Sequence, residues 1–128
     1  DLIILDAPCS SVGTIRRHPE IFFRKQIPNF NKLYILQKQL LNKAKMLLKK
    51  NGILIYMVCS FLIEEGEEQI FNFLKKNKNF SILDFSPLNL KESKIFINKH
   101  GFFYTPPSQI NNGLLIDGFF AAKLKKND

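Results

Sequence analysis

Long hydrophobic runs are absent from this sequence of 128 residues, although 45% of the residues are hydrophobic. No stretch approaches the ~20 consecutive apolar residues that a membrane-spanning helix needs. Internal repeats and domain linkers are absent as well. We therefore expect a soluble, monomeric protein of one domain with no membrane partner.

Cysteine is scarce, with two residues in the chain, and no signal segment is present. Two thiols without a secretory signal fit a reducing cytoplasm, where cysteine is more often catalytic or buried than part of a disulfide. The short Cys-x-x-Cys and His-x-x-x-His spacings of zinc sites are missing. We therefore expect no metal at the Cys and His residues, which are Cys9, His18, Cys59 and His100. Asp1 is followed at once by an apolar segment, and we interpret the chain as the C-terminal part of a longer one.

Acidic residues are few compared with basic ones, because 11 Asp and Glu stand against 19 Lys and Arg and give a net charge of +8. A charge of this size favours a polyanionic partner, and nucleic acid is the first candidate. A solvated basic surface is the alternative. The pairs Arg16-Arg17 and Arg24-Lys25 fit either interpretation.

Two apolar segments, Leu2–Leu5 and Ile53–Val58, lack the polar alternation of a half-exposed sheet, and we predict strands that are buried on both faces. Between them we predict an amphipathic helix with an Asn31 cap. Its expected buried face is Leu33, Leu36, Leu40, Ala44 and Leu47. A strand, a crossover helix and a second strand form a right-handed unit with parallel strands. Cys9 and Cys59 follow the two strands, so strands ~5 Å apart would bring both thiols together at the ligand-binding edge of the sheet.

The rest of the chain continues the alternation of strands and helices. Four glutamates between positions 64 and 68 open a second predicted helix, since acids favour the positive end of the helix dipole. Further strands are predicted at Phe80–Phe85, Gly101–Thr105 and Asp117–Leu124. This order predicts an α/β fold with a mostly parallel sheet and an antiparallel β-hairpin at its C-terminal edge. The connection Ala7–Pro28 is longer than most loops, which indicates a functional segment.

Four short segments stand out in the chain: Asp6-Ala7-Pro8-Cys9-Ser10 with Gly13, Ile15-Arg16-Arg17-His18-Pro19-Glu20, Cys59-Ser60, and Asp117-Gly118-Phe119-Phe120. In this order and spacing they resemble the motifs of the RsmB or Sun-type RNA cytosine-5 methyltransferases. The resemblance implies a Rossmann-like enzyme that uses S-adenosylmethionine to methylate carbon 5 of cytosine in RNA, usually ribosomal RNA. It also implies that residues 1–128 are the C-terminal portion of a single catalytic domain. The glycine-rich turn that would hold the cofactor does not occur in this chain, so we expect the fragment alone to be inactive.

The resemblance also implies roles for individual residues. Cys59 matches the nucleophile of the family, and Cys9 matches the cysteine that assists product release. Asp6 matches the aspartate that lies beside the cofactor and the target base. Pro8 belongs to the same segment and is expected to contact the substrate.

Two positions depart from the pattern of the family. Ser11 stands where the motif usually has glycine, and Val58 stands where a threonine usually precedes the nucleophile. Neither change removes a reacting atom. Ser11 nevertheless adds a side chain at a tight turn, where glycine is the least strained residue.

The chemistry explains why a thiol is needed. Carbon 5 of cytosine is a poor nucleophile, and a thiolate that adds to carbon 6 makes carbon 5 enamine-like. A free thiol has a pKa of about 8.5, so a cation or hydrogen-bond donors must lower the pKa of Cys59. Arg16, Arg17 and His18 are the candidates for this positive field and for contact with the substrate. Asp6 could bond the exocyclic amine or a protonated ring nitrogen of the base.

Each assignment has an alternative. Cys59 could be a small core residue, Cys9 a loop thiol, and Asp6 a brace for its own turn. For the whole protein, the alternatives are a non-catalytic RNA-binding remnant and, less favoured, a DNA cytosine-5 methyltransferase. In that DNA enzyme the cysteine after proline is the nucleophile, which would leave Cys59 unexplained.

Phenylalanine is frequent, with 13 residues, and two adjacent pairs attract attention. Phe22-Phe23 and Phe102-Phe103 could stack on flipped bases. Because the residue is so common here, we predict core packing for both pairs. We expect Asp117 and Gly118 to serve the fold, with Gly118 allowing a close contact or a bulge.

Overall fold

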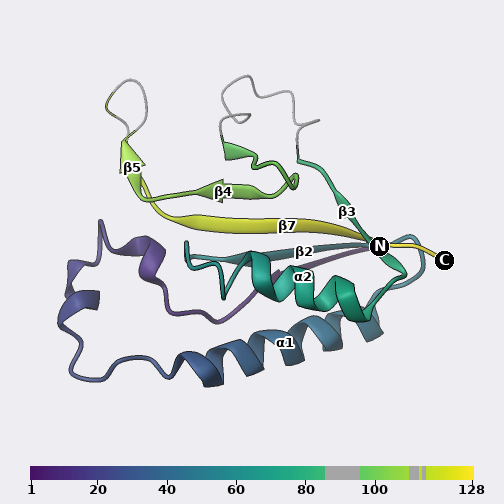
Figure 1. Cartoon of the computed structure of the whole chain (residues 1–128), viewed down its shortest axis with the longest axis horizontal. Helices are drawn as coiled ribbons and strands as arrows, with labels where there is room; N and C mark the ends of the chain where they lie inside the picture. The colour runs from purple at the N-terminus through teal and green to yellow at the C-terminus, as the bar shows by residue number, and fades with distance from the viewer. Residues whose placement is uncertain (86–95, 110–112, 114) are drawn as a thin grey trace.

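The computed structural model of the chain describes residues 1–85, 96–109, 113 and 115–128 (Figure 1). Within them, two α-helices lie against one face of a five-stranded sheet. The strands of this sheet are β1 (Leu2–Asp6), β2 (Ile53–Val58), β3 (Phe80–Leu83), β4 (Phe103–Thr105) and β7 (Phe119–Lys126). The helices are α1 (Phe30–Leu47) and α2 (Glu67–Lys76). The described residues also form short elements: two 3-10 turns, Val12–Thr14 and Pro19–Phe23, and a two-stranded sheet of β5 (Ser108–Gln109) and β6 (Leu115–Ile116).

The predicted βαβ unit is confirmed. β1 and β2 are parallel neighbours, with Leu2 opposite Ile53 and Asp6 opposite Met57. The helix α1 crosses between them and covers one face of the sheet (Figure 1). The fold is therefore α/β, and both strands end at the same edge, where Cys9 and Cys59 follow them.

The antiparallel strand lies elsewhere than predicted. The sheet has the order β1-β2-β7-β3, with β4 also paired to β7, so it is mixed and β7 runs through its centre (Figure 1). Phe120 and Leu124 of β7 are buried against the helices. On the same strand, Lys126 Nζ donates to the carbonyl oxygens of Lys45 (3.0 Å) and Leu48 (2.6 Å) at the end of α1. The aliphatic stem of such a lysine covers apolar surface, so the charges do not force β7 to the edge.

Only one face of the sheet is buried. Tyr56 and Val58 of β2 are fully buried beneath the helices. On the opposite face of β1, Leu2 and Ile4 are 55% and 59% exposed. The prediction that β1 and β2 are buried on both faces is therefore wrong for this chain, because the described helices cover one side alone.

The buried face of α1 also differs from the predicted one. Gln37, Leu41 and Ala44 are buried, whereas Leu36 and Leu47 are exposed. The cap is Asn29, whose side chain accepts from the Lys32 N–H group (3.0 Å), and not Asn31. The polar Gln37 takes a core position because its amide has partners there, as described below. No helix among the described residues is long and apolar enough to cross a membrane.

Candidate active site

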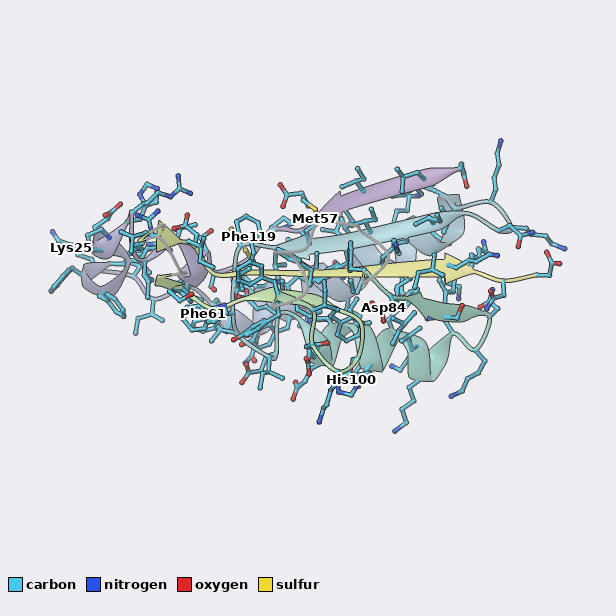
Figure 2. The ribbon with its side chains drawn as sticks, turned by 90° about the horizontal axis from the view of Figure 1, so that it is seen from above. Lys25, Met57, Phe61, Asp84, His100 and Phe119 are labelled. Carbon is cyan, nitrogen blue, oxygen red and sulfur yellow. The ribbon has the colours of Figure 1, made fainter. Side chains whose placement is uncertain are left out.

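The two thiols meet at the carboxyl edge of the sheet. Cys9 Sγ lies 3.3 Å from Cys59 Sγ, although the residues are 50 positions apart in the chain. The Ala7 N–H group donates to the Met57 carbonyl oxygen (2.9 Å), which continues the β1–β2 pairing up to the thiol loop. Figure 2 shows Met57 near this edge, beyond which the loop that carries Lys25 extends. The proximity predicted from the topology is therefore present.

Close backbone contacts fix the Cys59 segment. The Gly13 N–H group donates to the Cys59 carbonyl oxygen (3.0 Å), and the Gly118 N–H group donates to the Gly13 carbonyl oxygen (2.7 Å). A β-carbon at Gly13 would lie 1.9 Å from the Gly118 oxygen, so only glycine fits there. The expectation that Gly118 allows a close contact is confirmed, because it lies directly against Gly13.

A buried carboxyl group holds the Cys9 loop from the other side. Both oxygens of Glu65, which is fully buried, accept from Ser10: Oε1 from the N–H group (2.8 Å) and Oε2 from the hydroxyl (2.6 Å). Gln37 Nε2 donates to Glu65 Oε1 (3.2 Å) and to the Pro8 carbonyl oxygen (2.9 Å). Glu65 and Gln37 thus clamp the residues on each side of Cys9. Neither residue was identified from the sequence.

The two thiols have opposite shifts in pKa. A hydrogen bond from Cys9 and a second from the Ser11 hydroxyl lower the pKa of Cys59 to about 6, although its partial burial and the charge of Asp6 oppose this. The same contact with Cys59, together with burial, raises the pKa of Cys9 far above its ordinary value. In this arrangement Cys9 holds the proton of the S–H···S contact, and Cys59 is the thiol that ionises more readily.

Ser11, which departs from the family pattern, contributes to this arrangement. Its φ angle is 61°, the left-handed conformation that glycine adopts without strain. In that conformation Ser11 Oγ lies 3.5 Å from Cys59 Sγ. The extra side chain therefore adds a hydroxyl donor for the thiolate.

The pH dependence of alkylation tests these contacts. In the full-length protein, the rate at which iodoacetamide modifies Cys59 should rise with pH and reach half its maximum near pH 6, because only the thiolate reacts. Ser11→Gly should move this midpoint upward, and Cys9→Ala should move it further, since Cys9 is the stronger donor. Mass spectrometry of the Cys59 peptide gives the rate. Identical profiles for the three proteins would contradict the proposed donors.

Asp6 and Pro8 lie beside the thiol pair. Asp6 is exposed at the end of β1, and its charge raises the pKa of Cys59, which places the carboxylate within electrostatic reach of the thiol. Pro8 is exposed and holds its position through the bond from Gln37. Both residues are therefore accessible to a ligand at this edge.

The three cationic candidates have other partners. Arg17 Nε donates to Asp117 Oδ2 (2.6 Å), and Arg16 Nη2 lies 3.2 Å from Asp117 Oδ1. His18 Nδ1 lies 3.0 Å from Glu20 Oε1, and both side chains are largely exposed. The low pKa of Cys59 comes from hydrogen bonds and not from the field of these cations. Asp117 joins the 3-10 turns to β7, which agrees with its expected structural role.

No group of three or more His, Cys, Asp and Glu side chains that could hold a metal ion occurs in the described part of the chain. The described site therefore consists of two thiols, the exposed carboxyl group of Asp6, and a buried clamp.

Solved structures define the class of protein. A structure of the protein PH0851 has a TM-score of 0.78 and 34% identity, and the match covers 98% of this chain and 26% of that one. A methyltransferase homologue from Pyrococcus horikoshii has a TM-score of 0.64 and 27% identity over 98% of this chain and 39% of that one. The structure of NSun6 from the same organism, solved with SFG, has a TM-score of 0.72 and 24% identity, and the match covers 98% of this chain and 30% of that one. At this identity the likeness shows the fold alone. The chain thus has the α/β fold of a fragment of a methyltransferase catalytic domain.

The family follows from the sequence comparisons. The chain belongs to the 16S rRNA methyltransferase RsmB/F family, which matches residues 1–125. Ribosomal RNA small subunit methyltransferase B of Pasteurella multocida is 42% identical over 126 residues, which are 98% of this chain and 26% of that protein. The protein of the same name from Pectobacterium atrosepticum is 34% identical over 127 residues, 99% of this chain and 26% of that protein. The chain therefore spans about a quarter of the length of these relatives.

Proposed function

We propose that the full-length protein uses S-adenosylmethionine to methylate carbon 5 of cytosine in ribosomal RNA, with Cys59 as the nucleophile. The membership of the RsmB/F family supports an RNA methyltransferase. The observation that carries the finer proposal is the thiol pair, 3.3 Å apart, in which Cys59 is the thiolate and Cys9 keeps its proton. Such an asymmetric pair supplies one attacking group and one acid–base partner.

The reaction that suits this pair is covalent catalysis. The Cys59 thiolate adds to carbon 6 of the base, and the displaced π electrons make carbon 5 nucleophilic. Asp6 lies beside the thiols and is placed to bond the amine or the ring nitrogen of cytosine while charge develops. After methylation, a base such as water takes the proton from carbon 5, and the electrons of that C–H bond restore the double bond as the Cys59 sulfur departs as a thiolate. Cys9, in contact with the departing sulfur, is placed to assist this last step.

The cofactor would meet this chain at the end of β1. S-adenosylmethionine, when bound, supplies an electrophilic methyl group. The carboxyl group of Asp6 is exposed there and fits a partner that carries hydrogen-bond donors and positive charge. Leu2 and Ile4 expose an apolar face of the same strand, which supports our proposal that the chain is the C-terminal portion of a larger catalytic domain. A cytoplasmic location and a monomeric state stay predictions.

The proposal is tested by product analysis. The full-length protein, incubated with a ribosomal RNA transcript and S-adenosylmethionine, should produce 5-methylcytidine in nuclease digests analysed by mass spectrometry. An RNA-binding remnant would produce none, although it could still bind the transcript. A DNA enzyme would methylate duplex DNA instead, and its nucleophile would be Cys9, the thiol whose pKa is raised here.

Removal of Cys9 should separate addition from release. In the full-length protein, Cys9→Ala should still form the bond between Cys59 and the RNA but release it slowly, because the partner of the departing sulfur is missing. A covalent complex should therefore accumulate and appear as a slow band on a denaturing gel. The double variant with Cys59→Ala should show no such band. Normal turnover of Cys9→Ala without an adduct would contradict the role of Cys9 in release.

A further inference from the structure

An exposed aromatic pair lies in the loop beyond the thiol site. Phe22 and Phe23 are 72% and 83% exposed, and Ile27 nearby is 80% exposed. The prediction of core packing is confirmed for Phe102, which is fully buried, but is wrong for Phe22 and Phe23. In Figure 1 the loop extends past the carboxyl ends of β1 and β2, and Figure 2 shows Lys25 at its far end. Such an exposed pair of rings is a candidate contact for a partner, and the residues around it indicate the chemistry of that partner.

The same loop is basic. Arg24 and Lys25 directly follow the aromatic pair, and both are exposed. The acidic side chain within the 3-10 turn, Glu20, is held by His18. A surface that combines exposed aromatic rings with cations matches the chemistry of single-stranded nucleic acid, whose bases stack on rings and whose phosphates pair with Lys and Arg.

The loop is joined to the Cys9 segment. Arg24 Nη1 donates to the Ser10 carbonyl oxygen (3.4 Å), one residue after Cys9. A hollow of about 280 Å³ separates the loop from the segment that follows Cys59, and its walls include Phe22, Arg24, Phe61 and Leu62. Apolar and aromatic walls of this kind suit a nucleobase. The hollow is thus lined by Phe22 and Arg24 of the loop and by Ser10, the neighbour of Cys9, and Phe23 and Lys25 are adjacent to it in the chain.

We propose that this surface, formed by Phe22, Phe23, Arg24 and Lys25 with the adjoining hollow, binds the unpaired nucleotides that flank the target cytosine. This inference rests on the proposed function and deepens it, since it names single-stranded RNA as the form of substrate that the site takes. Phe22 and Phe23 stack on the neighbouring bases, and Lys25 pairs with a phosphate. Because an enzyme that acts on carbon 5 needs its target base outside a stack, a platform for the neighbours favours the open strand.

The test measures binding of a short, unstructured, fluorescent oligoribonucleotide with one cytosine to the full-length protein. Changing both residues to alanine (Phe22→Ala with Phe23→Ala) should weaken binding by about 10-fold or more, because stacking on a single ring contributes about 5-fold or more in other proteins and two rings are lost. The variant with leucine at both positions (Phe22→Leu with Phe23→Leu) should lose as much RNA affinity, since leucine keeps apolar area but has no ring. The double tyrosine variant should bind like the wild type.

Matched controls separate RNA contact from packing. Met46 and Leu47 are another adjacent apolar pair, 68% and 62% exposed on α1, and their double alanine variant should leave RNA affinity unchanged. Lys25→Gln should reduce the slope of log affinity against log salt by about 1, as the loss of one phosphate contact does. Melting temperatures of all variants report folding.

Each outcome decides the proposal. Loss of affinity in the alanine and leucine variants, with tyrosine retaining it, supports base stacking. Unchanged RNA affinity in the double alanine variant overturns the proposal. So does a double leucine variant that retains RNA affinity while the double alanine variant has a lower melting temperature, because the two side chains then pack against protein. The proposed function is judged separately: 5-methylcytidine made by the wild type upholds it even if stacking fails, and RNA binding through Phe22 and Phe23 without product would refute methylation alone.

Discussion

Changing Cys59 to serine in the full-length protein is expected to reduce formation of 5-methylcytidine by on the order of a thousandfold or more, as the loss of a covalent nucleophile does in other enzymes. The hydroxyl has nearly the size of the thiol and keeps a hydrogen bond to Cys9 and Ser11. It is not ionised at neutral pH, however, whereas the pKa of Cys59 is about 6. The measurement is the initial rate with a ribosomal RNA transcript at saturating S-adenosylmethionine.

The melting temperature and the RNA affinity of this variant serve as its controls. Cys59 is half-buried, so Cys59→Ser should change the melting temperature little and leave RNA affinity near that of the wild type. The comparison with Cys9→Ala separates the two thiols, because that variant should trap a covalent complex that Cys59→Ser cannot form. Activity of Cys59→Ser within tenfold of the wild type would assign the nucleophile to another group.

The position of the thiols was predictable because it depends on local rules. Leu2–Leu5 and Ile53–Val58 are both recognisable as strands from short apolar runs, and the helical crossover between them makes them parallel. Cys59 follows its strand directly and Cys9 comes three positions after Asp6, so their proximity follows from the topology, whereas the contact of 3.3 Å also depends on the bonds that hold the two loops. The family motifs distinguish the two thiols, and the lowered pKa of Cys59 beside the raised pKa of Cys9 agrees with that distinction.

The place of β7 was not predictable by the same reasoning. A strand late in the chain pairs by long-range packing, and the order of the elements placed this one in a hairpin at the edge of the sheet. In the fold, Ala122 and Leu124 face the helices while Lys126 caps the carbonyl end of α1. Strand order is therefore set by complementarity across the sheet, for which a single sequence offers no periodic signal.

Polar groups were the other source of error. Gln37 was not singled out, and Glu65 was counted only among the acids that open the second predicted helix, because Gln and Glu side chains usually face solvent. Their burial follows from partners up to 55 residues away, Pro8 and Ser10, which supply donors and acceptors inside the protein. Once Gln37 faces inward, the buried side of α1 turns with it, which explains why the predicted leucine stripe was only partly correct. Four adjacent glutamates gave no signal to single out Glu65.

The buried clamp leads to the second large expected effect. Glu65→Leu in the full-length protein should lower the free energy of unfolding by about 1–3 kcal/mol, because the buried Ser10 N–H group loses its acceptor. Gln37 also loses its bond to Glu65 but keeps its bond to the Pro8 carbonyl oxygen, so its side chain contributes less to the loss of stability than the Ser10 N–H group does. Glu65→Gln should retain most of the stability: the amide oxygen accepts at the Oε1 position, and the Ser10 hydroxyl can turn to accept from the amide nitrogen.

The same variant should also change the chemistry of Cys59. Ser10 follows Cys9 directly, so a loop released from Glu65 no longer holds the Cys9 thiol 3.3 Å from Cys59. Because that contact is the main cause of the low pKa of Cys59, the midpoint of its alkylation should rise well above about 6 in Glu65→Leu and stay close to it in Glu65→Gln. Turnover at neutral pH should fall in the leucine variant as the thiolate fraction falls, and recover partly at higher pH.

A destabilised core far from the thiols provides the decisive comparison. Phe80 is buried on β3 and its ring centroid lies 5.0 Å from that of Phe73, so Phe80→Leu should lower the melting temperature through lost packing. It should leave the alkylation midpoint of Cys59 unchanged, because the loop clamp is intact. If Glu65→Leu and Phe80→Leu lower stability alike and neither moves the midpoint, Glu65 serves only the core. A midpoint that moves in Glu65→Leu alone identifies Glu65 as a positioning residue, which sets the reactivity of Cys59 through the placement of Cys9.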